Sequence, residues 1–91
     1  MTIRKNTNQN KEIGQLLKGL RLALNDIDKT RQAFIDDRSE KFFDNSDWIS
    51  EKTLQNYENG KNIPTIPNLL KLAVALEIDE RELLIKIKKR L

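Results

Sequence analysis

The side chains that most often carry catalysis and metal binding are missing, because this chain of 91 residues has no cysteine and no histidine. Their absence excludes disulfide bonds, zinc sites built on cysteine or histidine, and nucleophilic sites that need a Ser/His or Cys/His pair. The 14 carboxylates are scattered, and no two of them stand where the sequence implies a pocket. We therefore expect no enzymatic activity, no cofactor and no metal.

The basic side chains are concentrated at the two ends of the chain. The formal net charge is +3, yet the body between the basic segments 1–11 and 86–90 has an excess of acids. Net charge alone is therefore weak evidence for a polyanionic partner. No apolar run approaches the roughly 18 residues of a membrane span. We expect a soluble, cytoplasmic protein with no membrane partner.

Helical periodicity predicts an all-α domain over 11–91, preceded by a flexible basic arm at 1–10. Ser50, Thr65 and Asp79 can cap the starts of the last three helices, and Asp28 or Thr30 can cap the second. The fourth helix is apolar on more than one side, so we expect it to be the central buried helix. The predicted helices span about 11–25, 29–43, 51–59, 66–76 and 80–91.

The segment 50–64, SEKTLQNYENGKNIP, resembles the recognition-helix segment of the Cro/phage-repressor-like helix-turn-helix family. The segments 13–21 (IGQLLKGLR) and 66–84 (IPNLLKLAVALEIDERELL) look like the family's first helix and its fourth and fifth helices. The resemblance implies a five-helix, lambda-repressor-like DNA-binding domain. The family pattern S-x-x-x-[ILV]-x-x-[WYIL]-E-x-G-x-x-x-P is matched at each specified position by Ser50, Leu54, Tyr57, Glu58, Gly60 and Pro64.

The chain departs from the family pattern at two places. Glu77 stands where the family commonly has glycine after the fourth helix. An insertion at about 38–46 predicts an extended second helix or helix 2–3 connection. The segment 36–51, which contains the insertion, carries six acidic and two basic residues, so we expect it to point away from DNA. Its aromatic residues predict either a small core packed on helices one and three or a patch that binds a protein partner; they are Phe42, Phe43 and Trp48.

The resemblance implies that the outer side of the third helix faces the major groove of double-stranded DNA and that Glu58 is a scaffold position. Lysine can bond to guanine, asparagine or glutamine to adenine, and glutamate to cytosine. An ordinary solvated helix face would show the same polar residues. The predicted base-reading residues are Glu51, Lys52, Gln55 and Asn56. The predicted phosphate contacts are Thr30, Arg31, Ser50, Asn59 and Lys61.

The implied function is sequence-specific transcriptional regulation, most simply repression of a phage, plasmid or other mobile-element operon. We expect a homodimer on a palindromic operator, paired through Leu84, Ile87 and Leu91, although this stripe would equally close the core. Arg4, Lys5 and Lys11 form either an arm that reaches DNA or a disordered tail. The alternative function is an antitoxin or inhibitor that binds a protein partner through the acidic insertion and autoregulates its operon.

Overall fold

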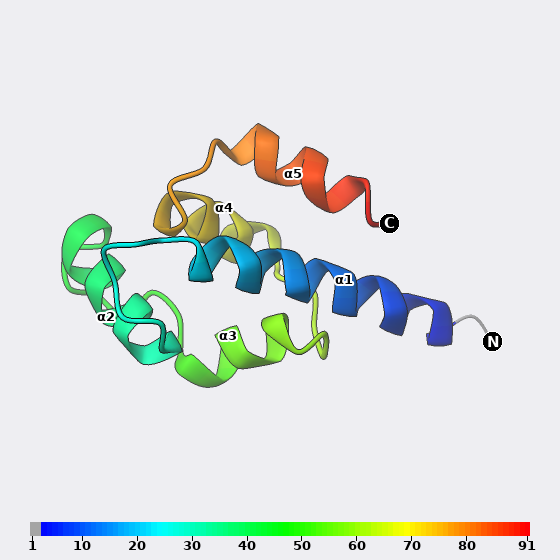
Figure 1. Ribbon diagram of the computed structural model, residues 1–91, viewed down its shortest axis with the longest axis horizontal. Helices are drawn as coiled ribbons and strands as arrows, with labels where there is room; N and C mark the ends of the chain where they lie inside the picture. Colours follow the sequence, from blue (N-terminus) through cyan, green and yellow to red (C-terminus); the bar gives the residue numbers. More distant parts are fainter. Residues whose placement is uncertain (1–2) are drawn as a thin grey trace.

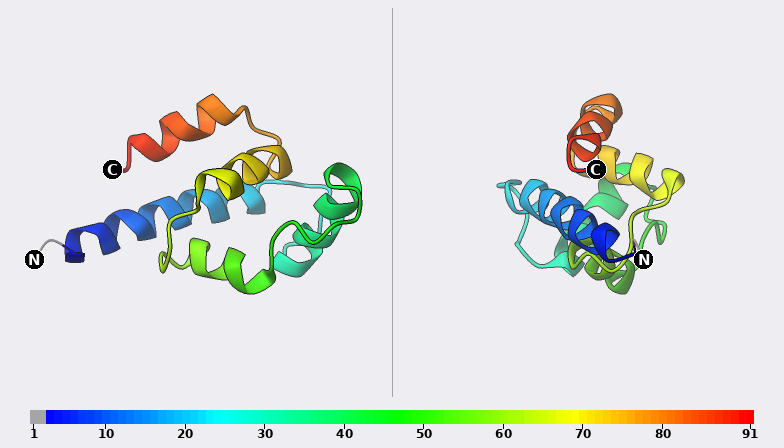
Figure 2. Two further views of the ribbon diagram at one scale, coloured as in Figure 1. Left: turned by 180° about the vertical axis from the view of Figure 1, so that it is seen from behind. Right: turned by 90° about the vertical axis from the view of Figure 1, so that its right-hand side faces the viewer.

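The helices are arranged around α1, with α3 on one side of it and the α4–α5 pair on the other (Figure 1). The views from behind and from the end also place α5 and α3 on opposite sides of α1, and the end view shows α4 beside α1 (Figure 2). The structure is a computed structural model that describes residues 3–91, with side chains described from Asn10 onward. Within this part of the chain there are five α-helices and no strand. They are α1 (Ile3–Leu22), α2 (Arg31–Phe42), α3 (Glu51–Glu58), α4 (Ile66–Ala75) and α5 (Glu80–Lys88).

Polar side chains cap the helices largely where the sequence predicts. The side-chain oxygens of Ser50, Thr65 and Asp79 accept hydrogen bonds from amides in the first turns of α3, α4 and α5. For α2 the cap is Thr30, whose hydroxyl oxygen accepts from the amide of Ala33 at 3.1 Å. These caps satisfy amides that have no partner inside the helix, which explains why the starts agree closely with the prediction.

The largest difference from the prediction concerns α1, which was expected over 11–25. The helix begins at Ile3, inside the segment predicted to be a flexible arm, and it ends at Leu22. The ammonium of Lys29 donates to the carbonyls of Leu22 and Leu24 at 2.8 and 2.7 Å, so the turn after α1 satisfies groups that a longer helix would have paired. The side chains of Arg4 and Lys5 lie outside the described residues.

Helix α4 is buried on one side only, so the prediction of a central buried helix is wrong for its outer side. Leu69 and Leu72 face the core, whereas Ile66, Leu70 and Val74 are 65%, 40% and 47% exposed. The exposed residues follow one another at intervals of four, which places them along one side of the helix. Within the described chain, α4 packs mainly against α2 and α5. These two helices leave its outer side uncovered.

The insertion lengthens α2 and then returns to α3 around a buried tryptophan. The indole nitrogen of Trp48 donates to the carbonyl of Ile35 at 3.1 Å. Its ring stacks on Phe43 and meets Phe34 edge-on, with centroids 4.7 and 5.9 Å apart. Packing is confirmed for both residues: Trp48 belongs to the same core cluster as residues of α1 and α3, and Phe43 packs against that cluster. Phe42 remains 40% exposed.

A fully buried arginine anchors the extended α2 to the end of α4. The guanidinium of Arg38 donates to the carbonyl of Ala75 and to the carboxylate of Glu77, both at 2.8 Å. The positive charge therefore lies at the negative end of the α4 dipole. Glu77 adopts a left-handed φ of 57°, where the family commonly has glycine, and its side chain reaches Arg38 from there. Nearby, the Lys41 ammonium holds the pKa of the exposed Asp26 carboxyl below its ordinary value.

Two glycines allow α1 to pass very close to the end of α3. A Cβ atom on Gly14 would lie 2.5 Å from the carbonyl oxygens of Tyr57 and Glu58, well inside van der Waals contact. Gly60 ends α3 as predicted, with a φ of 79°, and a Cβ atom there would lie 2.8 Å from the Cα atom of Lys11. The position of α3 relative to α1 therefore depends on the absence of these two side chains.

The two glycines of α1 give a matched test of this packing. We expect Gly14→Ala to lower the free energy of unfolding by about 1–3 kcal/mol, because the new methyl group meets backbone that cannot move aside. Gly19→Ala should raise it by about 0.5–1 kcal/mol, since nothing lies within 4 Å of its added Cβ atom and alanine favours the helix. Urea unfolding followed by circular dichroism measures both. Equal effects of the two substitutions would contradict the close approach.

Candidate nucleic-acid interface

Helix α3 has a buried side and an outer side, as the sequence predicts. Leu54 and Tyr57 are buried, and the hydroxyl oxygen of Tyr57 accepts a hydrogen bond from the amide of Asn68 on α4 at 2.7 Å. The four predicted base-reading residues stay on the outer side. Lys52 is exposed, and Glu51, Gln55 and Asn56 are half-buried. The structure therefore brings these four side chains together on one accessible surface.

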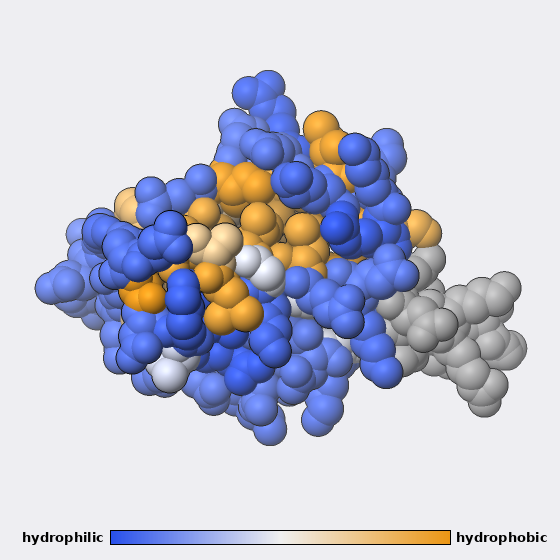
Figure 3. Space-filling view, viewed as in Figure 1, coloured by the Kyte–Doolittle hydropathy of each residue, from blue (hydrophilic) through white to orange (hydrophobic). Residues whose placement is uncertain are grey.

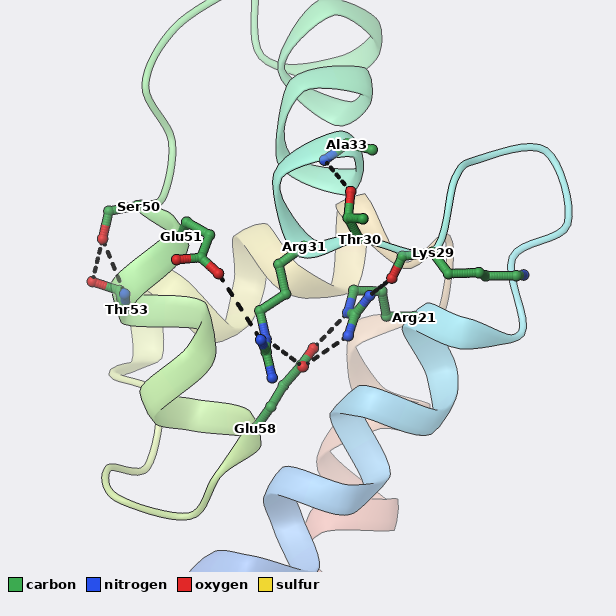
Figure 4. Close-up of polar contacts among 9 residues, drawn as sticks. All are labelled: Arg21, Lys29, Thr30, Arg31, Ala33, Ser50, Glu51, Thr53 and Glu58. Atoms are coloured by element: carbon green, nitrogen blue, oxygen red, sulfur yellow. Dashed lines mark hydrogen bonds and ion pairs between the residues drawn. The ribbon is translucent and has the colours of Figure 1, made fainter.

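The last residue of α3, Glu58, lies in an ion-pair cluster with two arginines, and its carboxylate is fully buried (Figure 4). Arg21 of α1 donates to both carboxylate oxygens, from Nε at 2.7 Å and from Nη2 at 2.9 Å. Arg31, the first residue of α2, donates to the same carboxylate from Nε at 2.9 Å. One carboxylate therefore ties together α1, α2 and α3, which is the scaffold position that the resemblance implies.

The two arginines of this cluster differ in what they leave accessible. Arg21 is buried and also donates to the carbonyl of Lys29 at 2.6 Å, so all three of its nitrogens are engaged. The Arg31 side chain is 21% exposed and lies 3.9 Å from the half-buried Glu51, a weak pair at that distance and exposure. The two arginines face the carboxylates of Glu58 and Glu51. The excess positive charge beside the start of α2 therefore comes from Lys18 and Lys29.

A cleft of about 530 Å³ opens beside the start of α2, and four of its eight lining residues are basic. The N-terminal amides of a helix together with lysine and arginine side chains form a favourable site for a phosphate group. Sequence reasoning identified Thr30 and Arg31 but missed the two lysines. Lys29 could have been identified from the sequence because it directly precedes the cap residue Thr30. Lys18 could not, because its place in the cleft depends on how α1 crosses α2. The polar lining residues are Lys18, Arg21, Lys29, Thr30, Arg31, Gln32 and Glu51.

The other predicted phosphate contacts lie at the two ends of α3. The hydroxyl of Ser50 accepts from the amide of Thr53 at 3.0 Å and donates to its hydroxyl at 2.8 Å, so it is engaged in capping. Asn59 and Lys61 are exposed where α3 ends. Lys11, predicted to be part of the arm, lies within α1 against Gly60 and is also exposed.

The predicted dimer contacts on α5 separate into two groups. Leu84 and Leu91 are 40% and 63% exposed, whereas Ile87 is 8% exposed and closes the core. Ile87 is therefore not available to contact a second copy, because its side chain already packs inside the domain. No helix of the described chain is both long and apolar enough to cross a membrane.

The comparisons with known proteins agree with this arrangement. Residues 40–83 match a protein-family model described as Helix-turn-helix. The match runs from the end of α2, through α3 and α4, into α5, and it confirms the resemblance to the Cro/phage-repressor-like family for this segment. Together with the five helices, it supports a lambda-repressor-like fold and a DNA-binding transcriptional regulator. No curated protein and no solved structure matches the chain.

Removing the central carboxylate tests the ion-pair cluster. We expect Glu58→Ala to lower the free energy of unfolding by about 3–5 kcal/mol, because it leaves the Arg21 charge buried without its partner. Glu51→Ala, at the other end of α3, should change it by less than about 0.5 kcal/mol, since its pair with Arg31 is half-exposed. Thermal and urea unfolding measure both variants. A Glu58→Ala protein as stable as Glu51→Ala would show that the cluster does not hold the helices.

Proposed function

We propose that this protein is a sequence-specific repressor that reads the major groove of double-stranded DNA with the outer side of α3. One observation carries the proposal. The inward residues of α3 are buried and its last residue is held by two arginines, while four polar side chains remain on its accessible side. A rigid helix with such a side fits the width and the hydrogen-bonding groups of the major groove.

Each of the four side chains has a natural base partner. The Lys52 ammonium suits the N7 and O6 atoms of guanine, and the amide of Gln55 or Asn56 suits adenine. Glu51 can accept a hydrogen bond from the amino group of cytosine, and its proximity to Arg31 moderates the repulsion between its carboxylate and DNA phosphates.

Phosphate contacts at both ends of α3 would fix its register on the duplex. At the start of α2 we assign this role to Thr30 and Arg31, with Lys18 and Lys29 beside them in the basic cleft. Ser50 precedes α3, and Asn59 and Lys61 follow it. The insertion begins at the opposite end of α2 from Thr30. Its residues Ser39 and Ser46 line a cleft with Ser50 and Glu51 at the start of α3.

Occupation of an operator by two copies would block transcription of the adjoining gene. A homodimer through α5 would read a palindromic operator whose half-sites are about 34 Å apart, one turn of DNA. The setting we propose is a phage, plasmid or other mobile-element operon. A protein partner at the acidic insertion, as in an antitoxin, is the second candidate. The exposed Phe42 favours it, although Trp48 and Phe43 are used in packing.

Selection from a pool of random DNA duplexes tests the proposed function. We expect repeated selection to enrich one short sequence present as an inverted repeat, because two copies related by a two-fold axis read equivalent half-sites. Sequencing of the bound pool measures the result. A bound pool with the same composition as the starting pool would contradict sequence-specific reading.

Substitutions on α3 and just after it should have different consequences. We expect Lys52→Ala and Asn56→Ala to weaken binding to the selected site by about 1–3 kcal/mol and to relax the preference at single positions. Lys61→Ala should weaken binding to all sequences and reduce the slope of log affinity against log salt by about 1. Fluorescence anisotropy at several salt concentrations separates the two patterns. A uniform loss from Lys52→Ala would assign that residue to the phosphates.

A further inference from the structure

Asn59 is the only asparagine in the sequence that is followed by glycine. An asparagine before glycine is labile in water, because the glycine has no Cβ atom to keep its backbone nitrogen away from the asparagine side chain. That nitrogen can attack the side-chain carbon Cγ, which closes a succinimide ring, while the side-chain amide leaves as ammonia and takes the backbone proton. Water then opens the ring and yields aspartate or isoaspartate. The net change replaces an uncharged amide by a carboxylate.

The folded end of α3 holds Asn59 in a conformation that prevents ring closure. The ring requires the Gly60 nitrogen to lie on the same side of the backbone as the Cβ atom of Asn59. At the observed ψ of −1°, the Gly60 nitrogen instead lies on the side of the Asn59 backbone nitrogen. The Gly60 N–H also donates to the carbonyl of Tyr57 at 3.1 Å, so its nitrogen is engaged. The attack on the side chain therefore requires the end of α3 to open.

Helix α1 holds the same end of α3 closed from outside. Gly60 is buried, and its backbone lies so close to Lys11 of α1 that an added Cβ atom would be 2.8 Å from the Lys11 Cα atom. One turn further along α1, Gly14 lies equally close to the carbonyls of Tyr57 and Glu58. Opening the end of α3 therefore breaks the packing of α1 on α3, and the free energy of this local opening controls access to the ring.

We propose that Asn59 is a modification site that is closed in the folded domain and is converted to aspartate or isoaspartate when the end of α3 opens. Its side chain is exposed, and the surface over α3 is almost entirely hydrophilic in the view of Figure 3, so the water that opens the ring is at hand. The consequence for DNA rests on the proposed function, because Asn59 follows the helix that reads the major groove. A carboxylate at this position repels DNA phosphates.

Mass spectrometry of peptides from the incubated full chain tests the site without DNA. We expect Asn59 to deamidate about tenfold or more faster in unfolding concentrations of urea than in buffer, because the folded conformation blocks the ring. Asn62 is an internal control: it is also exposed, but the β-branched Ile63 follows it, so it should change little in either condition. Equal rates for Asn59 in the folded and unfolded chain, or no modification in either, would overturn the proposal.

Two glycine variants of α1 give a matched test in buffer without urea. We expect Gly14→Ala to speed deamidation of Asn59 by about fivefold or more, because its methyl group meets the carbonyls at the end of α3 and favours opening. Gly19→Ala makes the same change where nothing lies within 4 Å and should not speed the reaction. Equal rates in the two variants would overturn the role of α1. If Gly14→Ala does not fold, the comparison in urea decides.

Binding to the selected duplex tests the consequence of the modification. We expect Asn59→Asp to raise the Kd by about three- to tenfold at low salt and by less at high salt, because the added charge repels phosphates. Incubation should weaken binding by the wild type, whereas Asn59→Gln, whose longer side chain cyclises much more slowly, should keep its own starting affinity. An Asn59→Asp chain that binds as Asn59→Gln does would overturn the effect on DNA. A wild-type chain that binds all duplexes equally would overturn the proposed function, while mass spectrometry still decides the modification.

Discussion

The arrangement of this domain depends on one buried carboxylate, that of Glu58 at the end of α3. It accepts hydrogen bonds from Arg21 on α1 and Arg31 on α2, so three helices are joined at a single group. A buried ion pair contributes little net stability compared with apolar packing, but it tolerates few other geometries. Here it fixes the direction of α3, because the end of the helix cannot move without breaking bonds to two neighbouring helices.

The insertion is accommodated without disturbing this arrangement. Arg38 holds the lengthened α2 against the end of α4, and Trp48 holds the returning segment against α2. The connection to α3 is longer than in the family, yet it is packed and hydrogen-bonded, and it delivers Ser50 to the capping position of α3. The long connection therefore leads into α3 as a packed and capped segment.

Local chemistry made much of the fold predictable, whereas long-range pairing did not. The caps at Ser50 and Thr65 and the glycine at position 60 define helix ends through hydrogen bonds with near neighbours. Arg21 lies on the inward side of α1, and a buried arginine needs an acidic partner. The spacing of residues along α1 does not show which acid this is, because Glu58 is 37 residues away in the sequence. The apolar residues on the outer side of α4 predict burial, but this side is exposed. The periodicity of a sequence does not show how many other helices pack against a given helix.

We propose that the start of α3 and the start of α2 together contact DNA. Amide chemical shifts measured during titration with a duplex that carries the selected site test it most directly. We expect the largest changes in chemical shift at residues 50–56 and at residues 29–31, with little change at the insertion, 38–46. Changes concentrated on the outer side of α4 or on the insertion, with α3 unaffected, would show that α3 does not bind DNA.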